Sequence, residues 1–215
     1  MIARTTIIVV AVSSWHSSAV GGIISDAGFF TGLSHTFVNF ETRSGGASVT
    51  LGSGSSQAMP STEYQSLGVL IGPGATWTND AGSSFDQAQA IGGSPTIALS
   101  AGGAAFSIQF TSPVQAMGLF VMQNKNGATA TLTAFDASNK LIQTVTLSGE
   151  TIDGTVGVAN YGFLGFVSSV GIARVSVAAS PSLYDNLYFS SVPSPGAVGL
   201  VAGAGLVSAR RRRSA

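Results

Sequence analysis

Residues Ala128–Leu147 read ATATLTAFDASNKLIQTVTL, and this stretch gives the clearest indication of the fold class. Apolar and polar side chains alternate on both sides of Asp136–Lys140, which is the pattern of two half-buried strands. Asp, Ser and Asn favour tight turns because their side chains hydrogen-bond to nearby backbone groups. The stretch therefore predicts a hairpin with strands at Ala128–Phe135 and Leu141–Leu147.

The same pattern recurs along the chain, and no segment of ten residues outside the two ends shows the periodicity of a helix. A second turn is expected at Asn124–Gly127, between two strands. Many short strands with regularly spaced turns are typical of a single β-sandwich or jelly roll, so we expect an all-β domain. The further strands predicted are Thr36–Thr42, Ala47–Leu51, Leu67–Ile71, Thr96–Leu99, Ala105–Phe110, Ala116–Met122, Gly162–Phe166, Ile172–Ala178 and Leu183–Phe189.

Composition and charge agree with this class and exclude others. The chain has 215 residues, of which only 8% are charged, and its 28 glycines with many Ser, Thr and Val favour strands and turns. Five of the nine basic residues lie near the two ends. The body between them has four basic and nine acidic residues, a net charge of −5. Nucleic-acid binding is not expected, because it depends on clustered Lys and Arg.

Several kinds of reactive site are also excluded or unsupported. The chain has no cysteine, which excludes disulfides and thiolate metal sites. His16 lies in the N-terminal segment, so His35 is the histidine of the body, and we expect it to be a polar residue at the entry of a strand. A catalytic triad or an HExxH zinc site is therefore unsupported. Gly52–Ser56 lacks the Lys-Ser/Thr ending of a phosphate loop and is interpreted as a surface loop.

The N-terminal segment has the three parts of a secretory signal peptide. Met1–Arg4 is cationic, Thr5–Trp15 is apolar, and Ser17, Ser18 and Ala19 are small residues at a cleavage position. We expect a signal helix at residues 1–19 with cleavage after Ala19, a lead-in at residues 20–35 and the sandwich domain at residues 36–190. The alternative is a buried first strand, since the start of the apolar run is β-branched.

The C-terminal segment, residues 191–215, combines a proline motif, an apolar run and a basic cluster. At about 1.5 Å per helical residue, the apolar run of residues 197–209 spans roughly 20 Å of a hydrocarbon core about 30 Å thick. We therefore expect a short hydrophobic helix that pauses in the membrane, with the arginines on the cytoplasmic side. The alternative is a core helix with a solvated basic end. The motif is Val192, Pro193, Ser194 and Pro195, and the cluster is Arg210, Arg211, Arg212 and Arg213.

These residues resemble the PEP-CTERM sorting signal of Gram-negative and related bacteria. In that family an exosortase, a membrane cysteine peptidase, recognises the tail. The resemblance implies export, transient residence in the inner membrane, and a final position at the cell surface, at the outer membrane or in the extracellular matrix. Ser194 departs from the family motif, which usually has Glu at that position.

The stretch Phe106–Phe189 is similar to the β-sandwich domains that often precede such tails. The similarity rests on Pro113-Val114, Thr131–Asp136, Gly162–Phe166, Ile172–Val175 and Asp185–Leu187. It implies a galactose-binding-like jelly roll of the kind used by carbohydrate-binding modules. Jelly-roll modules of this type often bind a structural Ca²⁺ between terminal strands. Glu41 and Asp185 are the candidate ligands, because Ca²⁺ prefers carboxylate and carbonyl oxygens.

The sequence leaves three classes of function open. The first is a non-enzymatic surface or matrix protein that binds an extracellular polysaccharide or a surface protein. The second is an exported carbohydrate-active enzyme with a carboxylate pair, and the third is a structural component without a ligand. Tyr64, Trp77 and Phe85 are candidates for a sugar-binding surface, although covering the end of the sandwich is their more ordinary role.

Overall fold

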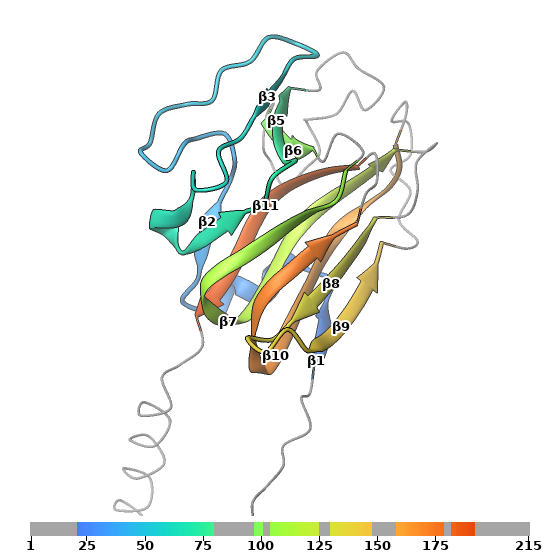
Figure 1. The fold of residues 1–215 in the computed structure, drawn as a ribbon. Coiled ribbons are helices and arrows are strands. Elements are labelled where there is room, and N and C mark those ends of the chain that lie inside the picture. Colours follow the sequence, from blue (N-terminus) through green and yellow to red (C-terminus); the bar gives the residue numbers. More distant parts are fainter. Residues whose placement is uncertain are drawn as a thin grey trace, which may run out of the picture.

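The computed structural model describes residues 21–79, 97–100, 104–124, 130–147, 158–178 and 182–191. The strands of these residues join in one antiparallel sheet that folds into a sandwich, which confirms the all-β class (Figure 1). Two short 3₁₀ helices, η1 (Ala27–Gly32) and η2 (Gln65–Leu67), connect strands. The strands are β1 (Gly21–Ile24), β2 (Thr36–Val38), β3 (Ser56–Ala58), β4 (Val69–Ile71), β5 (Thr76–Asn79), β6 (Ile97–Ser100), β7 (Phe106–Asn124), β8 (Thr131–Phe135), β9 (Leu141–Thr146), β10 (Val158–Val177) and β11 (Ser182–Ser191).

The long strands β7 and β10 belong to both layers of the sandwich. In one layer, the strand order is β1, β10, β7, β11, β6, β5 and β3, with each strand paired to the next. β2 also belongs to this layer, where it pairs with the other end of β11. In the other layer, β4 pairs with the first residues of β7, and the last residues of β10 pair with β8, which pairs with β9. Figure 1 shows β7 and β10 running through the middle of the molecule.

An irregularity in the β7–β10 pair marks the change from one layer to the other. The register shifts between the pairs Val167↔Ala116, Ile172↔Val114 and Arg174↔Gln109. Pro113 lies in this part of β7, between the paired residues Phe110 and Val114, as expected of proline at an irregularity in a strand. Gly171 has a φ of 81°, a conformation that other residues rarely adopt. Such bulges bend strands and let them pass between sheets.

The core lies between the layers, and alternation along the strands supplies it. In β8, for example, Leu132 and Ala134 point inward while Thr131 and Thr133 face out. A smaller apolar cluster lies on the outer face of the first layer, where η1 covers the sheet. Its buried members are Ile24, Phe30, Ala116 and Phe163. The lead-in expected at residues 20–35 therefore contributes a strand and this cover.

The predicted strands agree with the structure best in the second half of the chain. The Asp136–Lys140 turn is confirmed, since the Asp136 carboxylate accepts hydrogen bonds from Ser138 N and Lys140 N. β7 and β10 each join two predicted strands. The strand predicted at Ala47–Leu51 is wrong, because this segment forms an isolated bridge at Ser48, and the strand that begins at Thr36 ends at Val38 instead of Thr42. β1, β3 and β5 were not predicted.

Several predictions concern residues outside the described ranges. These are the signal peptide at residues 1–19, the sorting motif and arginine cluster at residues 192–215, and residues 125–127 of the Asn124–Gly127 turn. None of the helices in the described part of the chain has the length and apolar character needed to cross a membrane.

Gly165 and Gly118 face each other across the β7–β10 pair, and this close approach gives a test of the fold. A methyl group on Gly165 would overlap the Met117 carbonyl oxygen and lie 2.8 Å from Gly118 Cα. We expect Gly165→Ala to lower the free energy of unfolding by about 1–3 kcal/mol, the usual cost of overpacking. Urea denaturation of the full chain measures this change.

Gly162→Ala is the matched control on the same strand. Its added methyl group would lie 3.1 Å from the flexible end of Leu147, which can move aside, so the loss should be smaller. Equal stability of the Gly165→Ala and wild-type proteins would contradict the pairing.

Candidate functional site

The segment that follows β2 turns sharply and folds into a compact loop. Phe40 adopts a φ of 57° and its side chain is fully buried, with its ring edge against Tyr64 at 5.6 Å. Hydrogen bonds from Arg43 N to Ala47 O (2.7 Å) and from Gly46 N to Arg43 O (2.8 Å) close the loop. The left-handed conformation of Phe40 turns the backbone after β2. The predicted strand therefore does not continue to Thr42, although its apolar and polar residues alternate.

Glu63 and Trp77 hold this loop against the sandwich. The Glu63 carboxylate accepts hydrogen bonds from Arg43 Nη1 (3.3 Å) and Ser44 N (3.2 Å). The Arg43 guanidinium carbon lies 4.6 Å from the centre of the Trp77 ring, within the range of a cation–π interaction. The positive charge of Arg43 is therefore already matched by a carboxylate and an aromatic ring.

Tyr64 connects the loop to the core through its hydroxyl group. The hydroxyl donates to Thr42 O (2.9 Å) and accepts from Trp77 Nε1 (3.3 Å). Burial raises the pKa of Tyr64 from 10.0 to about 12, and the hydrogen bond from Trp77 offsets part of this rise. The side chain is 2% exposed, so Tyr64 supports the loop and presents little surface to solvent.

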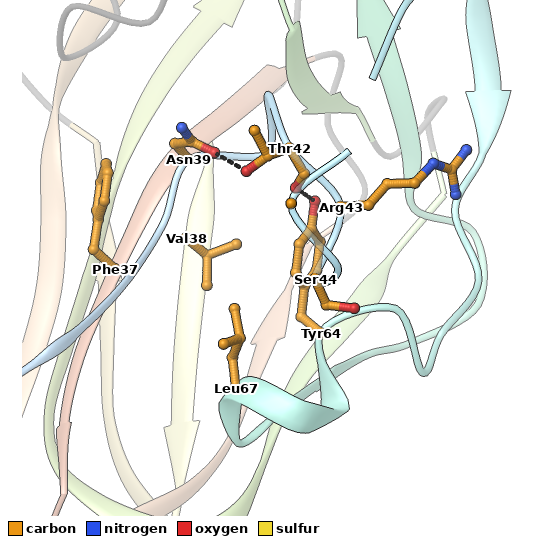
Figure 2. A pocket seen from close by; sticks show the side chains of 9 residues that line it. Phe37, Val38, Asn39, Thr42, Arg43, Ser44, Tyr64 and Leu67 are labelled. Atoms are coloured by element: carbon orange, nitrogen blue, oxygen red, sulfur yellow. Dashed lines mark hydrogen bonds between the residues drawn. The ribbon is translucent and has the colours of Figure 1, made fainter. Parts of the chain in front are cut away.

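A pocket of about 200 Å³ lies between this loop, β2 and η2. Its lining includes Phe37 and Leu67, which are 44% and 37% exposed. Figure 2 shows the Arg43 side chain pointing away from the hollow, with Phe37 on the opposite side. The Thr42 hydroxyl donates to Asn39 Oδ1 (3.1 Å), which fixes the amide at the rim. The lining residues are Phe37, Val38, Asn39, Thr42, Arg43, Ser44, Gly46, Tyr64 and Leu67.

The pocket differs from the sugar-binding surface that the sequence suggested. Tyr64 and Trp77 are buried, as expected of residues that cover the sandwich, and Phe85 lies outside the described ranges. Phe37 and Leu67 were not predicted from the sequence as site residues. A signal for Phe37 was present, because alternation places it on the same face as Asn39 and opposite the buried Val38.

Glu41 and Asp185, the predicted calcium ligands, both lie near the place where β6 pairs with β11. Glu41 Oε1 accepts a hydrogen bond from Ile97 N at the start of β6 (2.8 Å). Asp185 follows Tyr184, which pairs with Leu99 of β6. The Asp185 carboxylate is 1% exposed and accepts from Asn186 N (2.7 Å). Carboxylate oxygens are a donor type that Ca²⁺ takes, and a shared ion stays a prediction.

Three further titratable residues of the described ranges make local contacts. His35 precedes β2 as expected, and its exposed ring lies with Nδ1 2.8 Å from Leu33 O. Glu63 holds Arg43, and Asp136 holds its turn. Within the described ranges, no three Asp, Glu or His side chains gather where they could hold a metal ion. A calcium site would therefore depend on backbone carbonyl oxygens besides the two carboxylates.

Comparison with known proteins gives weak structural similarities. No protein-family model and no curated protein matches the sequence. The structure is similar to Arthrobacter globiformis T6 isomalto-dextranase in complex with panose, with 12% identity and a TM-score of 0.34 over 80% of this chain; the chain spans about a third (34%) of that protein. It is also similar to CBM29-2, a family 29 carbohydrate-binding module, with 9% identity and a TM-score of 0.24 over 75% of this chain and 99% of the module.

Tyr64→Phe should destabilise the protein at neutral pH and make it less sensitive to alkali. Thr42 O and Trp77 Nε1 lose a partner, which costs about 1–3 kcal/mol in the free energy of unfolding. Because the folded-state pKa is raised to about 12, the stability that Tyr64 contributes is complete below pH 10 and is lost as the pH rises toward 12. Urea denaturation at pH 7 and at pH 11 measures both effects.

Tyr184→Phe is the control for this experiment. Burial also raises the pKa of Tyr184 to about 12, although Ser182 offsets part of the rise. Ser182 lies near this hydroxyl, but among the described residues none meets it with the geometry of a full hydrogen bond. Tyr184→Phe should therefore reduce the alkaline loss but cost less stability at pH 7. An equal cost for both variants at pH 7 would contradict the role given to Tyr64.

Calcium should stabilise the folded chain if Glu41 and Asp185 share an ion, because a ligand that binds the folded state raises the melting temperature by mass action. We expect millimolar CaCl₂ to raise the melting temperature relative to EDTA, and Glu41→Gln to abolish the difference. Asp136→Asn, which changes a turn carboxylate elsewhere, is the control. Identical melting curves of the wild type in CaCl₂ and EDTA would show that the site does not exist.

Proposed function

We propose that the chain is an exported, membrane-sorted surface protein whose sandwich binds a neutral glycan without catalysing a reaction. The pocket beside Phe37 is the observation that supports glycan binding. It combines exposed apolar walls with fixed polar groups, which is the composition of sites that bind small organic ligands.

The pocket can satisfy the two kinds of surface that a sugar ring offers. Phe37 and Leu67 provide apolar contact for the C–H faces of the ring. Asn39, Thr42 and Ser44 provide donors and acceptors for its hydroxyl groups. The backbone that carries these groups is fixed by the Arg43–Ala47 and Tyr64–Thr42 hydrogen bonds, so little order has to be gained on binding.

The charges around the pocket favour an uncharged ligand. Arg43 is paired with Glu63 and stacked on Trp77, so it offers no unmatched charge to an acidic sugar. The body of the chain carries a net charge of −5, which repels polyanions at a distance. A volume of about 200 Å³ is smaller than the range of about 300–1,000 Å³ typical of drug-sized ligands, which suits one sugar unit.

The positions of the chain ends are compatible with the proposed export and sorting. β1 begins at Gly21, so cleavage after Ala19 leaves this strand complete. Gly21 pairs with Ser168 of β10, and Ser191 pairs with Val114 of β7. Both partners lie near the bend of the β7–β10 pair, so the two ends of the described chain leave from the same region. A sandwich held by an exosortase-recognised tail would then present its remaining surface away from the membrane.

Phe37→Ala should weaken glycan binding at least about tenfold, because the exposed ring contacts the ligand and packs little against the core. A glycan array identifies neutral sugars bound by the wild type, and isothermal titration calorimetry gives the affinities. Leu141→Ala is the control, since Leu141 is 57% exposed on β9 in the other layer.

Absence of binding to every neutral glycan, with and without Ca²⁺, would contradict the proposal. Release of reducing sugar during the same incubations would instead support the enzyme with a carboxylate pair.

The sorting tail should act as a processing signal held in the membrane. Replacing Arg210–Arg213 with neutral residues should let unprocessed protein escape, because charged residues resist crossing the bilayer. Replacing Pro193 and Pro195 should leave insertion intact but impair cleavage. Cell fractionation with antibodies against the body and the tail distinguishes these outcomes. A mature surface protein that still carries its arginines would show that the tail is a permanent anchor.

A further inference from the structure

A series of aromatic rings continues from the pocket across the outer face of the first layer. Phe37 of β2 pairs directly with Tyr188 of β11, and their ring centres are 4.8 Å apart. Phe30 of η1 stacks on Tyr188 at 5.5 Å with an angle of 28° between the planes. His35 lies 5.6 Å from Tyr188, and Phe29 lies 5.3 Å from Phe30. We call these five residues the aromatic strip.

Packing explains only part of the aromatic strip. Phe30 is 1% exposed and fills the space between η1 and the sheet, as a core residue does. Phe29 and Phe37 contribute less to this packing, because they are 41% and 44% exposed, and His35 is exposed between them in the sequence. The two exposed rings lie at opposite ends of a series whose middle members, Phe30 and Tyr188, hold them in place.

The aromatic strip is continuous with the pocket, since Phe37 belongs to both. It contains no Asp, Glu, Lys or Arg, so it offers no permanently charged side chain to an acidic polymer or to a lipid headgroup. Neighbouring rings are 4.8–5.9 Å apart, comparable with the dimensions of a sugar ring. If one sugar of an oligosaccharide occupies the pocket, the neighbouring sugars would therefore lie against the aromatic strip.

We propose that the aromatic strip is an extended binding surface for the neighbouring sugars of a neutral oligo- or polysaccharide, with Phe29 as its far contact. This inference rests on the proposed function of the pocket and extends it, because it states that the preferred ligand is a chain and not a single sugar. Tyr188 and Phe30 are positioning residues, and Phe29 and Phe37 contact the ligand.

The test is the dependence of affinity on chain length. The probes are glucose and the malto-, cello- and isomalto-oligosaccharide series of two to six units, together with any other neutral series found on the array. Calorimetry uses the full chain in a mild detergent. We expect the affinity for the preferred series to rise by about tenfold or more from one unit to the longest chain, which corresponds to about 1.4 kcal/mol.

Three variants separate the aromatic strip from the pocket. Phe29→Ala should abolish the gain with chain length and leave the affinity for one unit unchanged, whereas Phe29→Tyr should retain the gain. Phe37→Ala should weaken both. Leu141→Ala should change neither, and melting temperatures check that each variant folds.

The possible results distinguish this inference from the function of the pocket. An affinity for single sugars that does not increase with chain length would overturn the extended surface and leave the pocket standing. Failure to bind any sugar would overturn both. If Phe29→Ala instead changes the sedimentation coefficient and leaves the length dependence intact, the strip is a contact between copies of the chain and the proposal is wrong.

Discussion

The pairing of β7 with β10 is the interaction on which the rest of the structure depends. Both strands pass through both layers, so every other strand is attached to one of them directly or through β11 or β8. Gly118 and Gly165 face each other in this pair, and Phe163 packs over the space that a side chain on Gly118 would fill. The absence of a side chain on Gly118 thus lets the Phe163 ring lie close to the sheet, where it belongs to the outer apolar cluster.

The candidate site depends on this arrangement through β11 and β2. β11 pairs with β7, and β2 pairs with the last part of β11, which sets Phe37 beside Tyr188. Phe40 then turns the chain, and Glu63, Tyr64 and Trp77 fix the loop that forms the other side of the pocket. The site is therefore built from a rigid sheet edge and a loop whose polar groups are already hydrogen-bonded, a combination suited to binding without rearrangement.

The sequence predicted the fold class and the hairpin of β8 and β9, because alternation over five or six residues and a side-chain-stabilised turn are local signals. From the sequence, β7 and β10 were each predicted as two separate strands, because the residues at their bulges, Pro113 and Gly171, are typical of strand ends. The pocket was not predicted. It depends on Phe40 in a left-handed conformation and on contacts of the loop with Glu63 and Trp77, which are about 20 and 34 residues away in the sequence.

Amide chemical shifts followed during titration with a neutral oligosaccharide show whether the face formed by β2, η1 and the loop after β2 binds glycans. If it does, we expect shift changes to concentrate on residues 28–46 and 64–68 and on β11 near Tyr188, with little change on β8 and β9. Shifts centred on the outer face of β8 and β9, or on the turn at Asp136–Lys140, would contradict it.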